Sequence, residues 1–381
     1  MSTDDLLGER PALRGDPVWT DDVLGGRSAA IVHEWYGSTG GAELVFRHIA
    51  GLLPAADRYA LWADRDADVS VFGRLRESWL ASTPLRHSKA LALPLMPLAW
   101  RTLTRQHYDV VLSSSHAFAH TVRIGDPRQT RHLSYVHTPA RYIWSPEFDE
   151  RGANPLLHGP RRILQAADRR LSRHVHAYAT NSREVRQRIQ RFWKRDAEVI
   201  YPPVDAAYFG AAPEGSRDYL LGLGRWIPYK NFDLMMAIAE ASGRPLVIAG
   251  HGPDEARLRR LAAASGAEIT IELRPDRARL RELYAGACAL LFPVHEDFGI
   301  IPVEAQAAGT PIIGLRRGGL LETVIDGETG VLVDGYDPAG YVAALDRLDE
   351  LDPTRIRAHA QTFAPELFAA RMNTWIADAL R

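Results

Sequence analysis

Cysteine is nearly absent from the sequence, since Cys288 is the single thiol in 381 residues. One thiol forms no intramolecular disulfide, and a Cys/His zinc site would lack its thiolates, so we expect a reducing, cytoplasmic compartment. The sequence also lacks any run of about 18 apolar residues, which excludes a membrane-spanning helix. The most apolar stretch, residues 90–100, contains Pro94 and Pro97 and is expected to be a buried connection, with a membrane-dipping loop as the alternative.

Neither sign of charge is in excess, because the sequence contains 46 Lys and Arg and 47 Asp and Glu. The near-zero sum excludes nucleic-acid binding through a bulk positive field. It conceals a basic stretch from Arg161 to Arg195, where eleven Lys or Arg stand against Asp168 and Glu184. We expect solvated helix faces there. The alternative is attraction to an anionic membrane or to a phosphate-bearing acceptor.

The usual nucleotide and metal signatures are absent. Two G-x-G-x-x-G patterns fail, because Ile227 and Glu255 stand where the third glycine belongs, and no P-loop occurs, which argues against nicotinamide and P-loop chemistry. A calcium-loop pattern that begins at Asp64 fails because Val69 replaces its glycine. We therefore predict no metal site.

Short apolar runs that alternate with amphipathic stretches are present in two series. Runs without internal alternation indicate strands buried on both faces, hence parallel sheets covered by helices. The expected strands are 28–33, 58–63, 109–114, 131–137, 175–180 and 197–201, then 218–224, 245–250, 268–273, 288–293, 310–315 and 330–334. The expected helices include 42–53, 182–193, 231–242, 254–264 and 277–285.

This pattern predicts two doubly wound α/β domains in tandem, consistent with the chain length. Pro202 and Pro203 withhold two N–H donors and mark a semi-rigid link between them. The expected parts are a flexible tail 1–27, an N-terminal domain 28–200, a linker 201–212, a C-terminal domain 213–362, and a helix 363–381 that packs back toward the N-terminal domain. Ligands of such folds bind beyond the carboxyl ends of the strands, so we expect the site between the domains.

Charged residues and glycines gather at the strand ends of the second domain. Gly224 and Arg225 close one expected strand, and Lys230 follows at a helix start. Two cations beside helix N–H groups can neutralise a diphosphate whose charge grows as a bond to it breaks. Gly250 and Gly252 close the next strand and permit close approach of a ligand to the backbone.

The most specific element is the segment 293–305. Glu296 follows a buried strand, a glycine turn at Gly299 comes next, and a helix is expected to start near Pro302, with Glu304 inside it. Carboxylates accept hydrogen bonds from vicinal hydroxyls, so Glu296 and Glu304, on either side of the glycine turn, suit recognition of a ribose and a hexose.

The spacing of Glu296 and Glu304 is the E-x7-E motif. Together with Gly40-Gly41, His137-Thr138-Pro139 and Gly318-Gly319, it makes the sequence resemble the retaining, nucleotide-sugar-dependent glycosyltransferases of family 4, in particular their mannosyltransferase-like branch. The resemblance covers nearly the whole chain after the tail. It implies a GT-B fold, in which two Rossmann-like doubly wound parallel-sheet domains face a central cleft.

The resemblance also implies roles for individual residues. His137, Arg225, Lys230 and Glu296 would form the catalytic set, with Arg225 and Lys230 on the diphosphate, Glu296 on the hexose and His137 near the reaction centre. The expected nucleotide-sugar-binding residues are Gly40, Gly41, Gly224, Gly250, Gly252, Asp297, Phe298, Gly299, Ile300, Ile301 and Glu304.

By the same resemblance, the expected activity is metal-independent, retaining transfer of a hexose to a hydroxyl acceptor in polysaccharide, glycolipid or glycoconjugate biosynthesis. Mannose from GDP-mannose is the leading donor, no cofactor is needed, and the acceptor can be lipid- or phosphate-linked. Alternatives are a UDP- or dTDP-sugar used on a small-molecule or natural-product acceptor, a nucleotide-sugar epimerase, a non-catalytic donor-binding subunit, and a membrane-recruitment module. The enzyme is expected in the cytoplasm or at the inner face of the cell membrane.

Overall fold

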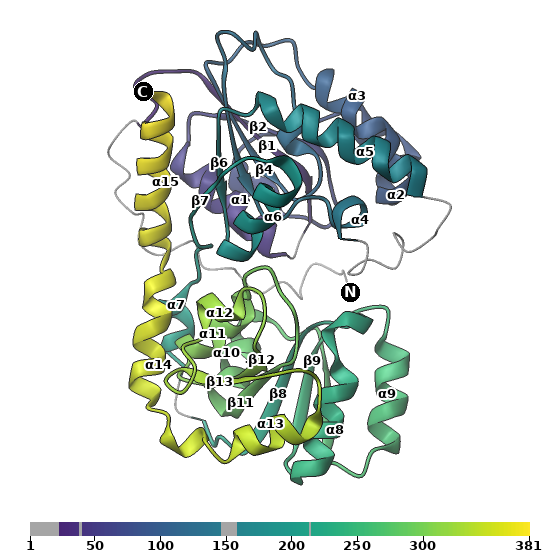
Figure 1. Ribbon diagram of the computed structural model, residues 1–381, viewed down its shortest axis with the longest axis vertical. Coiled ribbons are helices and arrows are strands. Elements are labelled where there is room, and N and C mark those ends of the chain that lie inside the picture. The colour runs from purple at the N-terminus through teal and green to yellow at the C-terminus, as the bar shows by residue number, and fades with distance from the viewer. Residues whose placement is uncertain (1–22, 38–39, 146–157, 213–214) are drawn as a thin grey trace, which may run out of the picture.

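A computed structural model describes residues 23–37, 40–145, 158–212 and 215–381 (Figure 1). Most of the expected tail therefore lies outside the described residues. Leu24, within the expected tail, is buried in the core of the first unit. No helix in the described part of the chain combines the length and the apolarity needed to cross a bilayer.

The first unit is built on a seven-stranded parallel sheet with the order β3-β2-β1-β4-β5-β6-β7. Its strands are β1 (Ala29–Tyr36), β2 (Asp57–Ala63), β3 (Leu75–Glu77), β4 (Val110–Ser115), β5 (Arg131–Val136), β6 (Ala177–Thr180) and β7 (Glu198–Val199). Successive side chains of β1 enter different cores, because Ile31 packs on one face of the sheet while Ala30 and Val32 pack on the other. Burial on both faces explains the apolar runs in the sequence.

The second unit is built on a six-stranded parallel sheet with the order β10-β9-β8-β11-β12-β13. Its strands are β8 (Tyr219–Arg225), β9 (Leu246–His251), β10 (Ile269–Leu273), β11 (Ala287–Phe292), β12 (Ile312–Leu315) and β13 (Gly330–Val333). Two parallel sheets wound with helices confirm the predicted fold class. All twelve predicted strands are present, and β3 was missed.

The helices of the first unit and of the connection are α1 (Gly41–Leu52), α2 (Lys89–Ala92), α3 (Met96–Arg101), α4 (Arg141–Trp144), α5 (His158–Leu171), α6 (Arg183–Trp193) and α7 (Ala206–Gly210). The prolines of residues 90–100 break that stretch into α2 and α3. Its burial is uneven, since Trp100 is fully buried whereas Leu91 and Leu98 are exposed. The prediction that residues 90–100 form a buried connection is therefore only partly correct.

The helices of the second unit are α8 (Phe232–Ser242), α9 (Glu255–Ala264), α10 (Arg277–Gly286), α11 (Ile300–Ala307), α12 (Leu320–Thr323), α13 (Pro338–Leu345) and α14 (Pro353–Ala360). The last helix, α15 (Pro365–Leu380), leaves this unit and runs beside the first sheet (Figure 1, yellow). Phe368, Met372 and Ile376 of α15 lie in the same core cluster as Phe46 of α1 and Tyr135 of β5. The chain therefore crosses between the units twice, once before β8 and once before α15.

Candidate functional site

The strand ends of the two units meet at a junction where candidate residues from both units are in contact. From the first unit come the loops before α1 and after β5, and from the second come the loops after β8 and after β11. Arg141 of α4 reaches across the junction, with its Nη2 atom 2.7 Å from Oδ2 of Asp297. Segments that lie more than 100 residues apart in the sequence are therefore brought together at this junction.

Lys230 and Glu296 form an ion pair within the second unit. Lys230 closes a short 3-10 turn after β8, and its side chain is buried. Burial is the largest single influence and acts to lower the pKa of Lys230, but the charge and hydrogen bond of Glu296 together with Tyr229 outweigh it and raise the pKa, so the ammonium stays protonated. Arg225, at the end of β8, is exposed.

The loop after β11 leads through Gly299, at φ 95°, directly into α11. The helix begins at Ile300, so the predicted start near Pro302 was two residues too late. Pro302 is the third helical residue, and proline is tolerated there because the first-turn N–H groups have no intrahelical acceptor. Gly319 donates its N–H to the Glu296 carbonyl at 2.8 Å, which fixes this loop against the next strand-end loop.

Glu304 lies on α11, half-buried, and its Oε2 atom accepts a hydrogen bond of 2.7 Å from the Tyr284 hydroxyl. Burial raises the pKa of Glu304 to about 7. This carboxyl group is therefore protonated more readily than an ordinary glutamate, and in its protonated form it can donate to a hydroxyl as well as accept from one.

Glycines bring the two units close together. A Cβ atom on Gly41 would lie 2.8 Å from Cδ1 of Ile300, so the loop before α1 touches the start of α11. Gly224, at φ 148°, lies beside Ile301 and Lys230, because a Cβ atom there would be 3.8 Å from a carbon of each. Gly40, Gly41, Gly224, Ile300 and Ile301 thus lie around one region.

Gly250 and Gly252 have a packing role beside this region. A Cβ atom on Gly250 would lie 2.0 Å from the Gly224 carbonyl oxygen, and one on Gly252 would lie 2.3 Å from the Trp226 carbonyl oxygen. Both positions therefore need glycine for the ends of β8 and β9 to approach each other.

His137 follows β5 and is almost fully buried. Its Nε2 atom lies 2.8 Å from Oγ of Ser114, and Asn181 donates to its carbonyl at 3.0 Å. Burial lowers the pKa of His137 well below its usual value, so the imidazole is neutral.

Contacts between the units include several residues that the sequence did not reveal as partners. Arg188 of α6 contacts Asp297 at 2.5 Å. Glu322 of α12 accepts hydrogen bonds from the backbone N–H groups of Arg183 at 2.8 Å and Glu184 at 3.2 Å, and so caps α6 from the other unit. Pairs that lie more than 100 residues apart leave no local pattern in the sequence.

One group within the described ranges has the composition and spacing of a metal site. His33, Glu34 and His116 offer ligand atoms within 4.8 Å of one another. The Glu34 Oε1 atom already accepts hydrogen bonds from the N–H groups of Ala117 and Ala119, each at 2.8 Å. This carboxylate therefore anchors the loop after β4.

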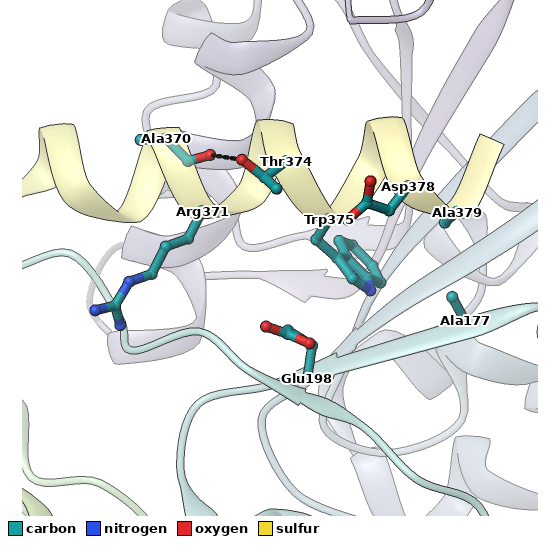
Figure 2. Close-up of a pocket in the computed structure, with 8 residues that line it drawn as sticks. All are labelled: Ala177, Glu198, Ala370, Arg371, Thr374, Trp375, Asp378 and Ala379. Atoms are coloured by element: carbon teal, nitrogen blue, oxygen red, sulfur yellow. Dashed lines mark hydrogen bonds between the residues drawn. The ribbon is translucent and has the colours of Figure 1, made fainter. Parts of the chain in front are cut away.

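A pocket of about 400 Å³ lies away from the junction, between α15 and the edge of the first sheet (Figure 2). It is lined by Ala177, Glu198, Ala370, Arg371, Thr374, Trp375, Asp378 and Ala379. None of the residues predicted for the site lines it.

Comparison with known proteins agrees with this arrangement. Residues 39–208 match the family described as Glycosyltransferase Family 4, and residues 209–363 match Glycosyl transferases group 1. A D-inositol 3-phosphate glycosyltransferase of Streptomyces bingchenggensis is 32% identical over 324 residues, which cover 74% of this chain and 69% of that protein. One of Acidothermus cellulolyticus is 38% identical over 183 residues, which cover 41% of this chain and 40% of that protein.

A solved structure shares the fold. Anabaena Alr3699/HepE, in complex with UDP-glucose, superimposes with a TM-score of 0.68 at 16% identity, over 92% of this chain and 99% of that chain. Fold, junction and sequence matches together define a glycosyltransferase, which confirms the predicted enzyme class. The chain belongs to the family 4, group 1 glycosyltransferases. This membership implies a nucleotide-sugar donor and a hydroxyl acceptor.

Proposed function

We propose that the enzyme transfers a hexose from a nucleoside diphosphate sugar to a hydroxyl acceptor with retention of anomeric configuration and without a metal ion. The observation that carries the proposal is the buried Lys230–Glu296 ion pair beside Gly224. A cation suited to a diphosphate and a carboxylate suited to sugar hydroxyls are held side by side. In the absence of donor the two charges neutralise each other.

Donor binding exchanges these partners. Lys230 turns to the diphosphate together with Arg225, while Glu296 accepts from the hexose hydroxyls and Glu304 from the ribose. As the anomeric carbon–oxygen bond breaks, negative charge grows on the leaving diphosphate. Preorganised cations at that position lower the barrier by several kcal/mol.

Retention follows from attack on the face that the diphosphate leaves. The acceptor oxygen forms the new bond to the anomeric carbon, the bond to the phosphate oxygen breaks, and that phosphate oxygen takes the acceptor proton. Glu296 and Glu304 bind hydroxyls in this scheme and are not the carboxylate pair of a hydrolase. His137 hydrogen-bonds the transferred sugar from the first unit.

Mannose from GDP-mannose is the proposed donor, supported by the His137-Thr138-Pro139 segment and Arg141. The relatives' name, D-inositol 3-phosphate glycosyltransferase, makes a phosphorylated polyol a candidate acceptor. The expected result is a thermal shift with GDP and GDP-mannose, because a ligand that binds only the folded state stabilises it by mass action.

The same donor panel separates the alternatives. A larger shift with UDP- or dTDP-sugars would reassign the donor. Transfer that requires an added acceptor supports the proposal, whereas a free epimer formed from donor alone would indicate an epimerase. Donor binding without turnover would indicate a non-catalytic subunit, and loss of activity on chelation that a metal restores would contradict the metal-free scheme.

Helix α5, which overlaps the basic stretch from Arg161 to Arg195, carries an exposed apolar side chain, as do α2 and α3. Ile163 of α5 is exposed, as are Leu91 of α2 and Leu98 of α3. Leu164 of α5 packs against the core that contains Trp100 of α3, so these helices share one part of the surface. The surface around Leu91, Leu98 and Ile163 is proposed to dock on an anionic membrane at the cytoplasmic face, with the arginines of α5 on lipid phosphates.

Flotation with vesicles that contain phosphatidylserine tests this docking. We expect the wild type to float and Leu98→Asp with Ile163→Asp to remain in the soluble fraction, because the apolar contact is lost. Leu261→Asp changes an exposed leucine of α9 and is the matched control. Equal flotation of both variants, or no flotation of the wild type at low salt, would rule the docking out.

A further inference from the structure

Asp297, directly after Glu296, is held by two arginines of the other unit. Its Oδ2 atom lies 2.7 Å from Nη2 of Arg141, and its Oδ1 atom lies 2.5 Å from Nη1 of Arg188. Burial acts to raise the pKa of Asp297, but the charges and hydrogen bonds of Arg141 and Arg188 together outweigh it and hold the pKa below its usual range. The side chain is therefore an ionised carboxylate with a cation on each oxygen.

Arg188 contacts the loops of both units at once. Besides Asp297, its Nη1 atom lies 3.4 Å from Oγ1 of Thr138, the neighbour of His137. One nearly buried guanidinium thus joins the loop that carries His137 to the loop that carries Glu296. These are the loops proposed to hold the transferred hexose from opposite sides.

A second contact braces the same arginine. Its Nη2 atom lies 2.8 Å from Oε1 of Glu184, and that oxygen lies 3.3 Å from Nε2 of His295 in the second unit. Arg188 is therefore fixed between two carboxylates, and its planar fork of donors suits this geometry better than the point charge of a lysine.

We propose that Asp297 and Arg188 are a positioning pair that aligns Glu296 with His137. This inference rests on the proposed function and deepens it, because it assigns Asp297 to the contact between the units instead of to the nucleotide sugar. When the units dock, the pair holds the loop that carries Glu296 and the loop that carries His137 in a fixed position relative to each other. Donor affinity is assigned instead to Lys230 and Glu304.

The split between kcat and donor KM tests this role. We expect Asp297→Asn and Arg188→Lys each to lower kcat by about 10- to 100-fold, because a shift of about 1 Å in a positioning group has that effect. Donor KM should change by less than about threefold. The double variant should lose less than the product of the two single effects, because the two changes share the contact between Asp297 and Arg188.

Arg279→Gln is the matched control. Arg279 also lies between two carboxylates, with Glu272 at 2.7 Å and Glu282 at 2.9 Å, but all three belong to the second unit. Its kcat and KM should equal those of the wild type. Unchanged kcat in Asp297→Asn would overturn the inference, as would a rise in donor KM alone, which would make Asp297 a donor ligand.

Small-angle scattering separates failure of the inference from failure of the proposed function. The radius of gyration of the ligand-free chain should increase in Asp297→Asn and Arg188→Lys and stay unchanged in Arg279→Gln. If the wild type transfers no sugar, the proposed function fails, and scattering still decides whether the pair docks the units. Asp297→Asn preserves the side-chain shape. This variant alone therefore tests the docking role if Arg188→Lys does not fold. Identical scattering of Asp297→Asn and wild type would overturn the docking role.

Discussion

At the scale of the residue, the candidate site consists of charges that are buried but paired. Lys230 is paired with Glu296, and Asp297 with two arginines, so none of these charges is left alone in the protein interior. Removing one partner of such a pair leaves the other charge buried without compensation. This lowers the stability of the folded protein more than the loss of an exposed ion pair does. Substitutions here should therefore affect stability as well as catalysis, and both must be measured.

Lys230→Ala is expected to lower kcat by about 10²- to 10³-fold, because one preorganised cation is lost from the leaving diphosphate. Steady-state transfer assays with saturating donor and acceptor measure the change. Arg259→Ala, which breaks an exposed ion pair with Glu255 on α9, should leave kcat unaltered. Full activity of both Lys230→Ala and Glu296→Ala would show that the site has been assigned wrongly.

The sequence pointed to candidate residues that the structure brings together, but not to their partners across the junction. Glu296, Glu304, Lys230 and the glycines occupy strand ends and turns, which local pattern reveals. The contact of Asp297 with Arg188 depends on how two separately folded sheets dock, and no local spacing encodes that. For the same reason the sequence predicted Asp297 only as a donor ligand and gave no sign of its contact with Arg188.

At the scale of the element, both sheets were predictable because buried parallel strands are continuous apolar runs. Strand β3 was missed since Leu75–Glu77 has three residues, none of them fully buried, at the sheet edge. The start of α11 was misplaced because Pro302 was expected at the first helical position, and Gly299 is the residue that precedes the helix. In residues 90–100 the prolines correctly signalled an interruption but not the exposure of Leu91 and Leu98.

Helix α15 is expected to stabilise the first unit although it follows the second in sequence. Met372 is fully buried in the first-unit core, so Met372→Ala should lower the free energy of unfolding by about 2–5 kcal/mol. Leu367 lies on the same helix and is exposed, so Leu367→Ala is the control. It should change the free energy of unfolding by less than about 0.5 kcal/mol. Calorimetry or thermal unfolding followed by circular dichroism measures both, and equal effects would mean that α15 does not contribute to that core.

At the scale of the whole molecule, two units joined by two chain crossings bring loops of both together at the candidate site. Arg141 and Arg188 reach from the first unit to Asp297, while Glu322 reaches back to the start of α6. The net charge near zero results from summation over a basic first-unit surface and acidic residues elsewhere. Neutrality of the whole chain is therefore compatible with an anionic donor and an anionic membrane.

We propose that Lys230 and Glu296 serve hexose transfer from a nucleoside diphosphate sugar with retention. The most direct test follows the transfer of an α-linked donor sugar to an added acceptor by proton NMR, in the wild type and in Lys230→Ala. We expect an α-linked product at the first turnover, formed about 10²- to 10³-fold more slowly by the variant. A β-linked product, or equal rates in the two proteins, would contradict it.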